Sequence, residues 1–199
     1  MRKSTKNIMA MDSNKWLKLI SEIEIEKNAR QWKRYIEENN FEIILPDIVL
    51  GEILMVLTKK EDARIWHERR IHLFRLMKSG QKFDFRRIAT EHDEEYYYLK
   101  AELFIKKYKT NELLKARGLC KSRDGKELYA LHKQDLAIFF SLKELNKAYY
   151  FITHDNGLKD ALMLAEIRKT FIEEGLCFIL IHETQAAKNR QVTRIKIMP

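Results

Sequence analysis

The chain is poor in cysteine, glycine and proline. Of its 199 residues, two are cysteines, six are glycines and two are prolines. Cys120 and Cys177 cannot build a disulfide framework, and no Cys-x-x-Cys or Cys/His zinc spacing occurs. The scarcity of glycine and proline excludes linkers and low-complexity sequence. No G-x-G-x-x-G or G-x-x-x-x-G-K-[ST] loop is present, so the common nucleotide-binding folds lose their main support.

Long hydrophobic runs are also missing. The apolar stretch after the basic N-terminus, residues 8–11, is too short for the core of a signal peptide. No run approaches the roughly 18 apolar residues that a transmembrane helix requires. We therefore expect a cytoplasmic protein with no membrane partner.

Positive charge is abundant and unevenly distributed. Lysine and arginine number 38 and aspartate and glutamate 29, which gives a net charge of +9. Residues 59–134 hold 20 of these cations and 12 of the acids, so nearly all of the excess lies there. A solvated surface normally mixes its signs, so this concentration favours an anionic partner, of which nucleic acid is the commonest.

Apolar runs alternate with helical patterns along the chain. We expect strands at 8–11, 41–45, 149–153 and 176–182 and an edge strand at 192–198; helices at 13–40, 48–58, 61–78, 90–117, 135–145 and 156–174; and a basic loop at 118–125. This alternation predicts a single α/β domain, residues 1–199, with a mostly parallel sheet. Residues 59–134 contain no clear strand and are predicted to form a basic helical insertion.

Four acidic residues fall where a parallel sheet would bring them together. Asp12 ends the first strand and Asp155 lies just past the strand at 149–153, while Glu52 and Asp135 lie in or beside apolar helical runs. Ligands of parallel α/β sheets bind at the carboxyl ends of the strands. Burying an unpaired carboxylate is costly, which favours a functional role for Glu52 and Asp135.

A carboxylate cluster repels itself and therefore needs a cation. Oxygen ligands without histidine or cysteine suit Mg²⁺ or Mn²⁺. Such an ion lowers the pKa of a bound water and can hold a phosphodiester oxygen for in-line attack. An acidic centre in a basic chain is the arrangement that a nuclease needs.

Several motifs, in this order along the chain, resemble those of the PIN-domain ribonucleases. They are Asp12-Ser13-Asn14, Leu45-Pro46-x-x-Val49-x-x-Glu52, Asp135-x-x-Ile138 and Phe151-Ile-Thr153-His-Asp155-x-x-Leu158. The resemblance covers roughly residues 7–58 and 128–182 and implies a three-layer α/β/α fold. It also implies that the four acids bind one or two divalent ions, supported by Ser13, Asn14 and Thr153, and that water hydrolyses RNA to 5′-phosphate and 3′-hydroxyl ends.

The chain departs from this family in two places. The 83 residues between Glu52 and Asp135 exceed the spacing in the small toxin members, and Asn156 and Gly157 follow Asp155 where a further acid is familiar. A haloacid-type phosphatase is disfavoured because Asn14 stands where that class needs aspartate.

Substrate and partners are the remaining expectations. We expect RNA to follow a phosphate path of six cations: Arg86, Arg87, Lys106, Lys107, Lys121 and Arg123. The alternatives are a non-catalytic RNA-binding protein on the same fold and a toxin ribonuclease held by an antitoxin. A homodimer is a further expectation. The six histidines show no ligand spacing and are interpreted as surface or core residues.

Overall fold

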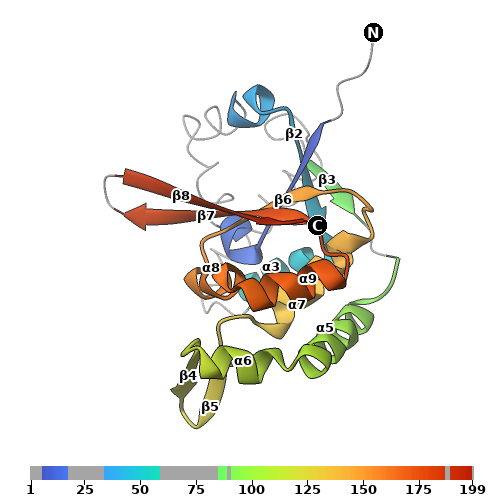
Figure 1. The fold of residues 1–199 in the computed structure, drawn as a ribbon. Helices are drawn as coiled ribbons and strands as arrows, with labels where there is room; N and C mark the ends of the chain where they lie inside the picture. Colours follow the sequence, from blue (N-terminus) through green and yellow to red (C-terminus); the bar gives the residue numbers. More distant parts are fainter. Residues whose placement is uncertain (1–5, 18–33, 59–84, 89–90, 187–188, 199) are drawn as a thin grey trace. The chain divides into compact units, whose positions relative to one another are not determined.

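The structure is a computed structural model that describes residues 6–17, 34–58, 85–88, 91–186 and 189–198. The chain forms two compact units, residues 1–89 and residues 90–199 (Figure 1). Each contains parallel strands and helices, so the α/β class expected from the sequence is confirmed. Much of the expected insertion at 59–134, namely 59–84, lies outside the described residues, so its helical character there stays a prediction.

Three parallel strands organise the first unit. Strand β1 (Asn7–Met11) pairs with β2 (Phe41–Pro46), and β2 pairs with β3 (Phe85–Ile88). Helix α3 (Asp47–Thr58) follows β2 directly. Consecutive residues of β2, Ile43 and Ile44, are both 0% exposed. Successive side chains of a strand point to opposite faces, so both faces of β2 are covered, which explains its continuous apolar run.

Strand β3 was not expected, because no strand was predicted between residues 59 and 134. Its sequence is Phe-Arg-Arg-Ile, and the two central arginines hide it from a search for apolar runs. It stands at the end of the strand order, β3-β2-β1. A strand at the edge of a sheet tolerates charged residues, which discourage pairing with other chains.

The second unit is built on strands β6 (Tyr149–Thr153), β7 (Phe178–Ala186) and β8 (Asn189–Ile197). Strands β6 and β7 are parallel, and β8 returns antiparallel to β7. The other elements are α5 (Glu94–Tyr108), α6 (Thr110–Ala116), the hairpin β4 (Cys120–Arg123) and β5 (Lys126–Tyr129), α7 (Lys133–Lys143), α8 (Asn156–Met163) and α9 (Ala165–Glu173). No helix in the described part of the chain is long and apolar enough to cross a membrane.

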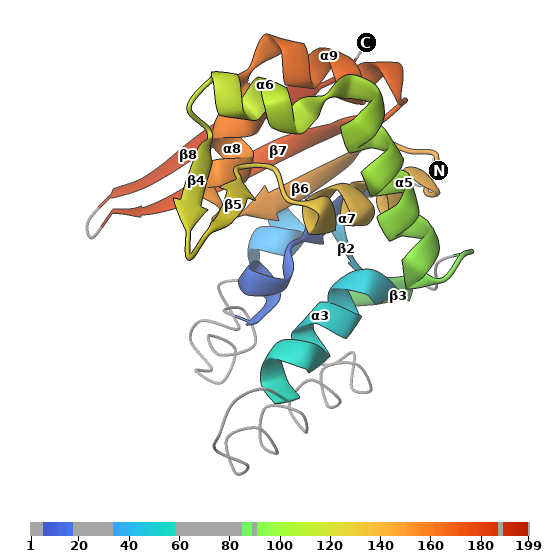
Figure 2. The ribbon, with the colours of Figure 1, turned by 90° about the horizontal axis from the view of Figure 1, so that it is seen from below.

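Stacked aromatic rings form the core of the second unit. Phe139 of α7 lies 4.5 Å from Phe178 of β7 and 4.9 Å from Phe151 of β6, measured between ring centroids. Phe171 of α9 closes the cluster at 5.7 Å from Phe139. All four side chains are fully buried. In Figures 1 and 2, α7 and α9 lie beside β6 and β7, and α5 lies outside them, where its Phe104 packs 5.4 Å from Phe171.

Two helices expected to be continuous are broken. The predicted helix at 90–117 divides into α5 and α6 at Lys109, whose φ of 49° is left-handed. The predicted helix at 156–174 divides at Leu164, which is extended. The expected basic loop at 118–125 is instead part of the β4–β5 hairpin. Its turn is Asp124-Gly125, and both residues have positive φ, which is the preference of a type I′ hairpin turn.

Candidate active site

Asp12 lies at the carboxyl end of β1, as the sequence predicted. Its side chain is only 7% exposed, and its Oδ1 accepts a hydrogen bond of 2.6 Å from the backbone N–H of Lys15. Its carbonyl accepts from Trp16 N, and residues 13–17 are helical. Asp12 therefore caps the helix that follows β1. The supporting residues begin that helix, with Ser13 half-buried and Asn14 exposed.

Glu52 is carried by the helix that follows the neighbouring strand. The parallel register places Met9 opposite Ile43, so continuing it aligns Asp12 with Pro46, immediately before α3. Glu52 is half-buried in the second turn of α3. The first unit thus places Asp12 and the start of the helix that carries Glu52 at the same edge of its strands, where ligands of parallel sheets bind.

Asp155 is the N-cap of α8, two residues beyond β6. Its Oδ1 accepts hydrogen bonds from Gly157 N at 2.6 Å and Leu158 N at 3.2 Å. Its own backbone N–H donates to the hydroxyl of the fully buried Thr153 at 2.9 Å. The helix N-terminus stabilises a negative charge at this position. Among the described residues, none donates a hydrogen bond to Oδ2, so one oxygen orients the carboxylate and the other can accept a ligand.

Asp135 belongs to the first turn of α7. Its Oδ2 accepts a hydrogen bond of 3.1 Å from the backbone N–H of His132, the N-cap residue, so Asp135 takes part in capping α7. The segment entering α7 touches α8: a Cβ added to Gly157 would lie 3.1 Å from the carbonyl oxygen of Ala130. Gly157 in the first turn of α8 therefore contacts Ala130, which precedes α7. Asp155 lies just beyond the carboxyl end of β6, and the segment that enters α7 lies against the start of the helix that Asp155 caps.

Two of the predicted RNA-binding cations already have acidic partners. Lys106 lies 2.8 Å from Glu102, and Lys107 lies 2.7 Å from Glu174. Hydrogen bonds from Lys106 and Lys133 lower the pKa of Glu102 to about 2. The hydrogen bond to Glu174 raises the pKa of Lys107. These lysines are exposed, but their charge is partly offset by their acidic partners.

The other four predicted cations differ in their surroundings. Lys121 and Arg123 are exposed on strand β4. Lys121 forms no ion pair within the described part of the chain, and Arg123 lies 3.7 Å from the equally exposed Asp124. Arg86 and Arg87 are in β3, opposite Ile44 and Leu45, and their side chains lie outside the described residues. Among the predicted cations whose side chains the structure describes, Lys121 and Arg123 on the hairpin are therefore the least neutralised by acidic partners.

His182 is a residue of this edge that the sequence analysis did not single out. It is the register partner of Thr153 on β7 and is 1% exposed. Burial lowers its pKa, and the nearby Lys159 lowers it further, whereas Asp155 opposes both effects. The lowered pKa favours the neutral ring at neutral pH, so His182 adds little positive charge beside Asp155. No spacing in the sequence could have found it, because its relation to Thr153 comes from strand pairing.

The fold has distant likenesses among solved structures. VapBC2 from Rickettsia felis, bound to a DNA fragment from its promoter, matches with 14% identity and a TM-score of 0.46, over 77% of this chain and 92% of that chain. FitAcB from Neisseria gonorrhoeae matches with 17% identity and a TM-score of 0.41, over 77% and 91%. No protein-family model and no curated protein matches the chain. Similarity this low says nothing about activity.

Two substitutions of Asp155 can separate its role as a helix cap from any catalytic role. Asp155→Ala removes both bonds and should lower the free energy of unfolding by about 0.5–2 kcal/mol. Asp155→Asn keeps an acceptor oxygen and a good N-cap and should change that free energy little. Urea unfolding of the two variants measures the difference. An Asp155→Asn protein as unstable as Asp155→Ala would show that the negative charge itself holds the helix.

Proposed function

We propose that the protein is a metal-dependent endoribonuclease that hydrolyses RNA phosphodiester bonds. One observation supports this above all: in each unit an aspartate directly follows a parallel strand and caps the next helix, Asp12 after β1 and Asp155 after β6. Glu52 in α3 and Asp135 in α7 are the proposed further ligands, one in each unit. The proposal is that these four carboxylates act together on the same divalent cation site, which holds one or two ions.

The donor atoms fit a hard divalent cation. All four proposed ligands are carboxylates, which favours Mg²⁺ or Mn²⁺ over softer metals. Asp155 suits the role because its Oδ1 is fixed by two backbone N–H groups while its Oδ2 accepts no hydrogen bond from the described residues. When bound, the ion would supply a water of lowered pKa and neutralise the charge that develops on the phosphate.

The residues of the chain itself would orient the ligands. The Thr153 hydroxyl accepts from Asp155 N and fixes the backbone at the start of α8. Asp135 is held by its own capping bond at the start of α7. Ligands that are already held in place lower the free-energy cost of assembling a metal site, so these hydrogen bonds would position Asp155 and Asp135 for the ion.

The β4–β5 hairpin is the surface best placed to hold RNA beside Asp155. Its base is closed by Ala130 N, which donates to Leu119 O at 2.9 Å. Ala130 is the residue that touches Gly157 in the first turn of α8. The exposed Lys121 and Arg123 therefore project from a segment anchored at the acidic edge of this unit. Cations at such a rim would hold the phosphate backbone without reading sequence.

Cleavage of single-stranded RNA should depend on a divalent ion and on Asp155. We expect wild-type protein to cleave with Mg²⁺ or Mn²⁺ and to stop with EDTA. Asp155→Asn should lower the rate by at least about a hundredfold, since it removes a charged ligand and keeps the helix cap. Asp160→Asn is the matched control on the same helix, because Asp160 is 45% exposed and, among the residues that the structure describes, pairs with its neighbour Lys159.

Equal losses in the Asp155→Asn and Asp160→Asn proteins would contradict the assignment. Tight RNA binding by a wild-type protein that never cleaves, with any divalent ion, would favour the alternative of a non-catalytic RNA-binding protein.

RNA affinity should fall steeply with salt and depend on the hairpin. Phosphate contacts release counterions, so replacing Lys121 and Arg123 with glutamine should weaken binding across many sequences and flatten the salt dependence. Lys106→Gln is the control, because Lys106 is already paired with Glu102 and should matter less. Binding is measured in the Asp155→Asn protein, which separates it from cleavage. Affinity that ignores salt, or that falls only in Lys106→Gln, would exclude the hairpin as the RNA contact.

A further inference from the structure

A second group of ligand-type side chains lies at the other end of α7 from Asp135. Glu91, His92 and Glu144 each offer one ligand atom, and these atoms lie within 4.8 Å of one another. Glu144 is the C-cap of α7, and Glu91 and His92 immediately precede α5. Asp135 and Glu144 are nine residues apart on one helix, about 13 Å along its axis, so this cluster is separate from the proposed active site.

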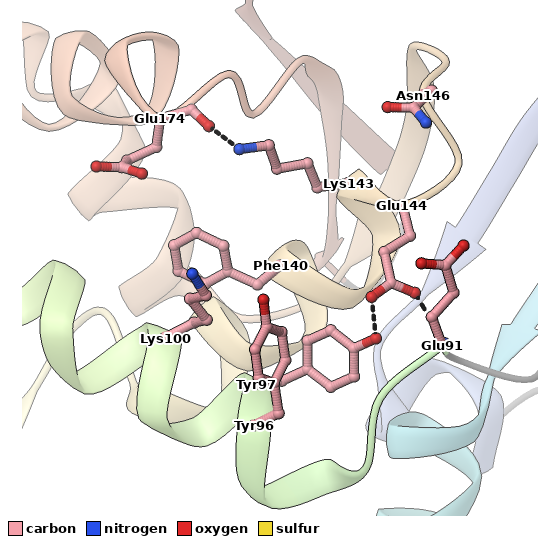
Figure 3. A pocket seen from close by; sticks show the side chains of 9 residues that line it. All are labelled: Glu91, Tyr96, Tyr97, Lys100, Phe140, Lys143, Glu144, Asn146 and Glu174. Atoms are coloured by element: carbon pink, nitrogen blue, oxygen red, sulfur yellow. Dashed lines mark hydrogen bonds between the residues drawn. The ribbon is translucent and has the colours of Figure 1, made fainter.

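Hydrogen bonds fix the central carboxylate of the cluster. Glu144 Oε2 accepts from the backbone N–H of Glu91 at 3.1 Å, and its Oε1 accepts from the hydroxyl of Tyr97 (Figure 3). Tyr97 is 1% exposed, so its hydroxyl is held by the core of the unit. The ring of His92 lies 3.9 Å from that of Tyr96, between centroids. One orienting donor is thus a buried side chain, and the other is a backbone N–H.

The local charge balance favours a cation. Neither Glu91 nor Glu144 forms an ion pair with another described residue, and Glu144 stands at the negative end of the α7 dipole. The two lysines that line the adjoining pocket make other contacts. Lys143 Nζ donates to the carbonyl of Glu174 at 2.6 Å, and Lys100 Nζ lies 5.3 Å from the centre of the Tyr96 ring.

We propose that Glu91, His92 and Glu144 form a binding site for a transition-metal ion, most suitably Zn²⁺. One imidazole nitrogen and two carboxylate oxygens are a zinc donor set, with bonds of about 2.0–2.2 Å. Two ligands on one ion lie at most about 4.4 Å apart, so small side-chain rotations would close the site. Histidine in the set disfavours Mg²⁺, which distinguishes this site from the four carboxylates.

The site leaves room for one more ligand and would link two helices. Glu91 and Glu144 also line a pocket of about 310 Å³, together with Lys100, Lys143 and Asn146 (Figure 3). Three protein ligands leave a coordination position for water or a small anion. The bound ion would fasten the segment entering α5 to the end of α7. Metal binding should therefore stabilise the folded protein, because an ion that binds only the folded state shifts the unfolding equilibrium.

The test is Zn²⁺ binding by the full-length protein that carries both Asp12→Asn and Asp155→Asn. These changes remove two ligands of the proposed nuclease site, so the result stands whether or not the protein is a nuclease. We expect calorimetry to show one Zn²⁺ per chain and Zn²⁺ to raise the thermal midpoint. His92→Gln and Glu144→Gln, each added separately, should weaken binding at least roughly tenfold and abolish the rise in the midpoint.

Two further variants keep the test decisive. Glu144→Gln keeps an acceptor oxygen for Glu91 N, and its amide NH₂ can donate to the Tyr97 hydroxyl. The thermal midpoint without metal shows whether each variant folds. Tyr97→Phe removes the hydroxyl that donates to Glu144 and accepts from His92 N, but it removes no ligand, so it should weaken Zn²⁺ binding by about tenfold. Glu95→Gln changes an exposed neighbouring acid and should bind like its parent. Zn²⁺ binding that survives His92→Gln and Glu144→Gln, or no binding in the parent, would overturn the proposal.

Discussion

The arrangement of the second unit depends on the close approach of Gly157 to Ala130. A Cβ at position 157 would lie 3.1 Å from the Ala130 carbonyl oxygen, so a side chain there would require a shift of a few tenths of an ångström. The contact sets the segment that enters α7 beside the start of α8, which Asp155 caps. It also sets the base of the β4–β5 hairpin there, since Ala130 closes that base. The proposed RNA contact beside Asp155 depends on this close approach.

Helix α7 connects the two proposed metal sites. Asp135 lies in its first turn and Glu144 at its C-cap, and between them Phe139 packs against Phe151 and Phe178. A helix fixed by a core of this density cannot shift at one end without moving at the other. Hard carboxylate oxygens at one end suit Mg²⁺ or Mn²⁺, and the mixed nitrogen–oxygen set at the other suits Zn²⁺.

The sequence predicted those features that depend on local apolar patterns. The strands at 8–11, 41–45 and 149–153 are confirmed, because residues buried on both faces leave continuous apolar runs. Strand β3 was missed because its arginines interrupt the pattern. The Glu91–His92–Glu144 cluster could not be found, since 52 residues separate its parts and only the packing of α5 on α7 joins them. That all four acids share one cation site stays a prediction.

Metal-directed cleavage of the protein backbone tests that central claim most directly. Fe²⁺ can replace Mg²⁺ at a carboxylate site, and with ascorbate and peroxide it cuts the chain close to where it binds. In a protein that carries His92→Gln and Glu144→Gln to remove the other cluster, mass spectrometry should find cuts near Asp12, Glu52, Asp135 and Asp155 that excess Mg²⁺ suppresses together. Cuts confined to one unit, or none that Mg²⁺ suppresses, would contradict a site shared by the four carboxylates.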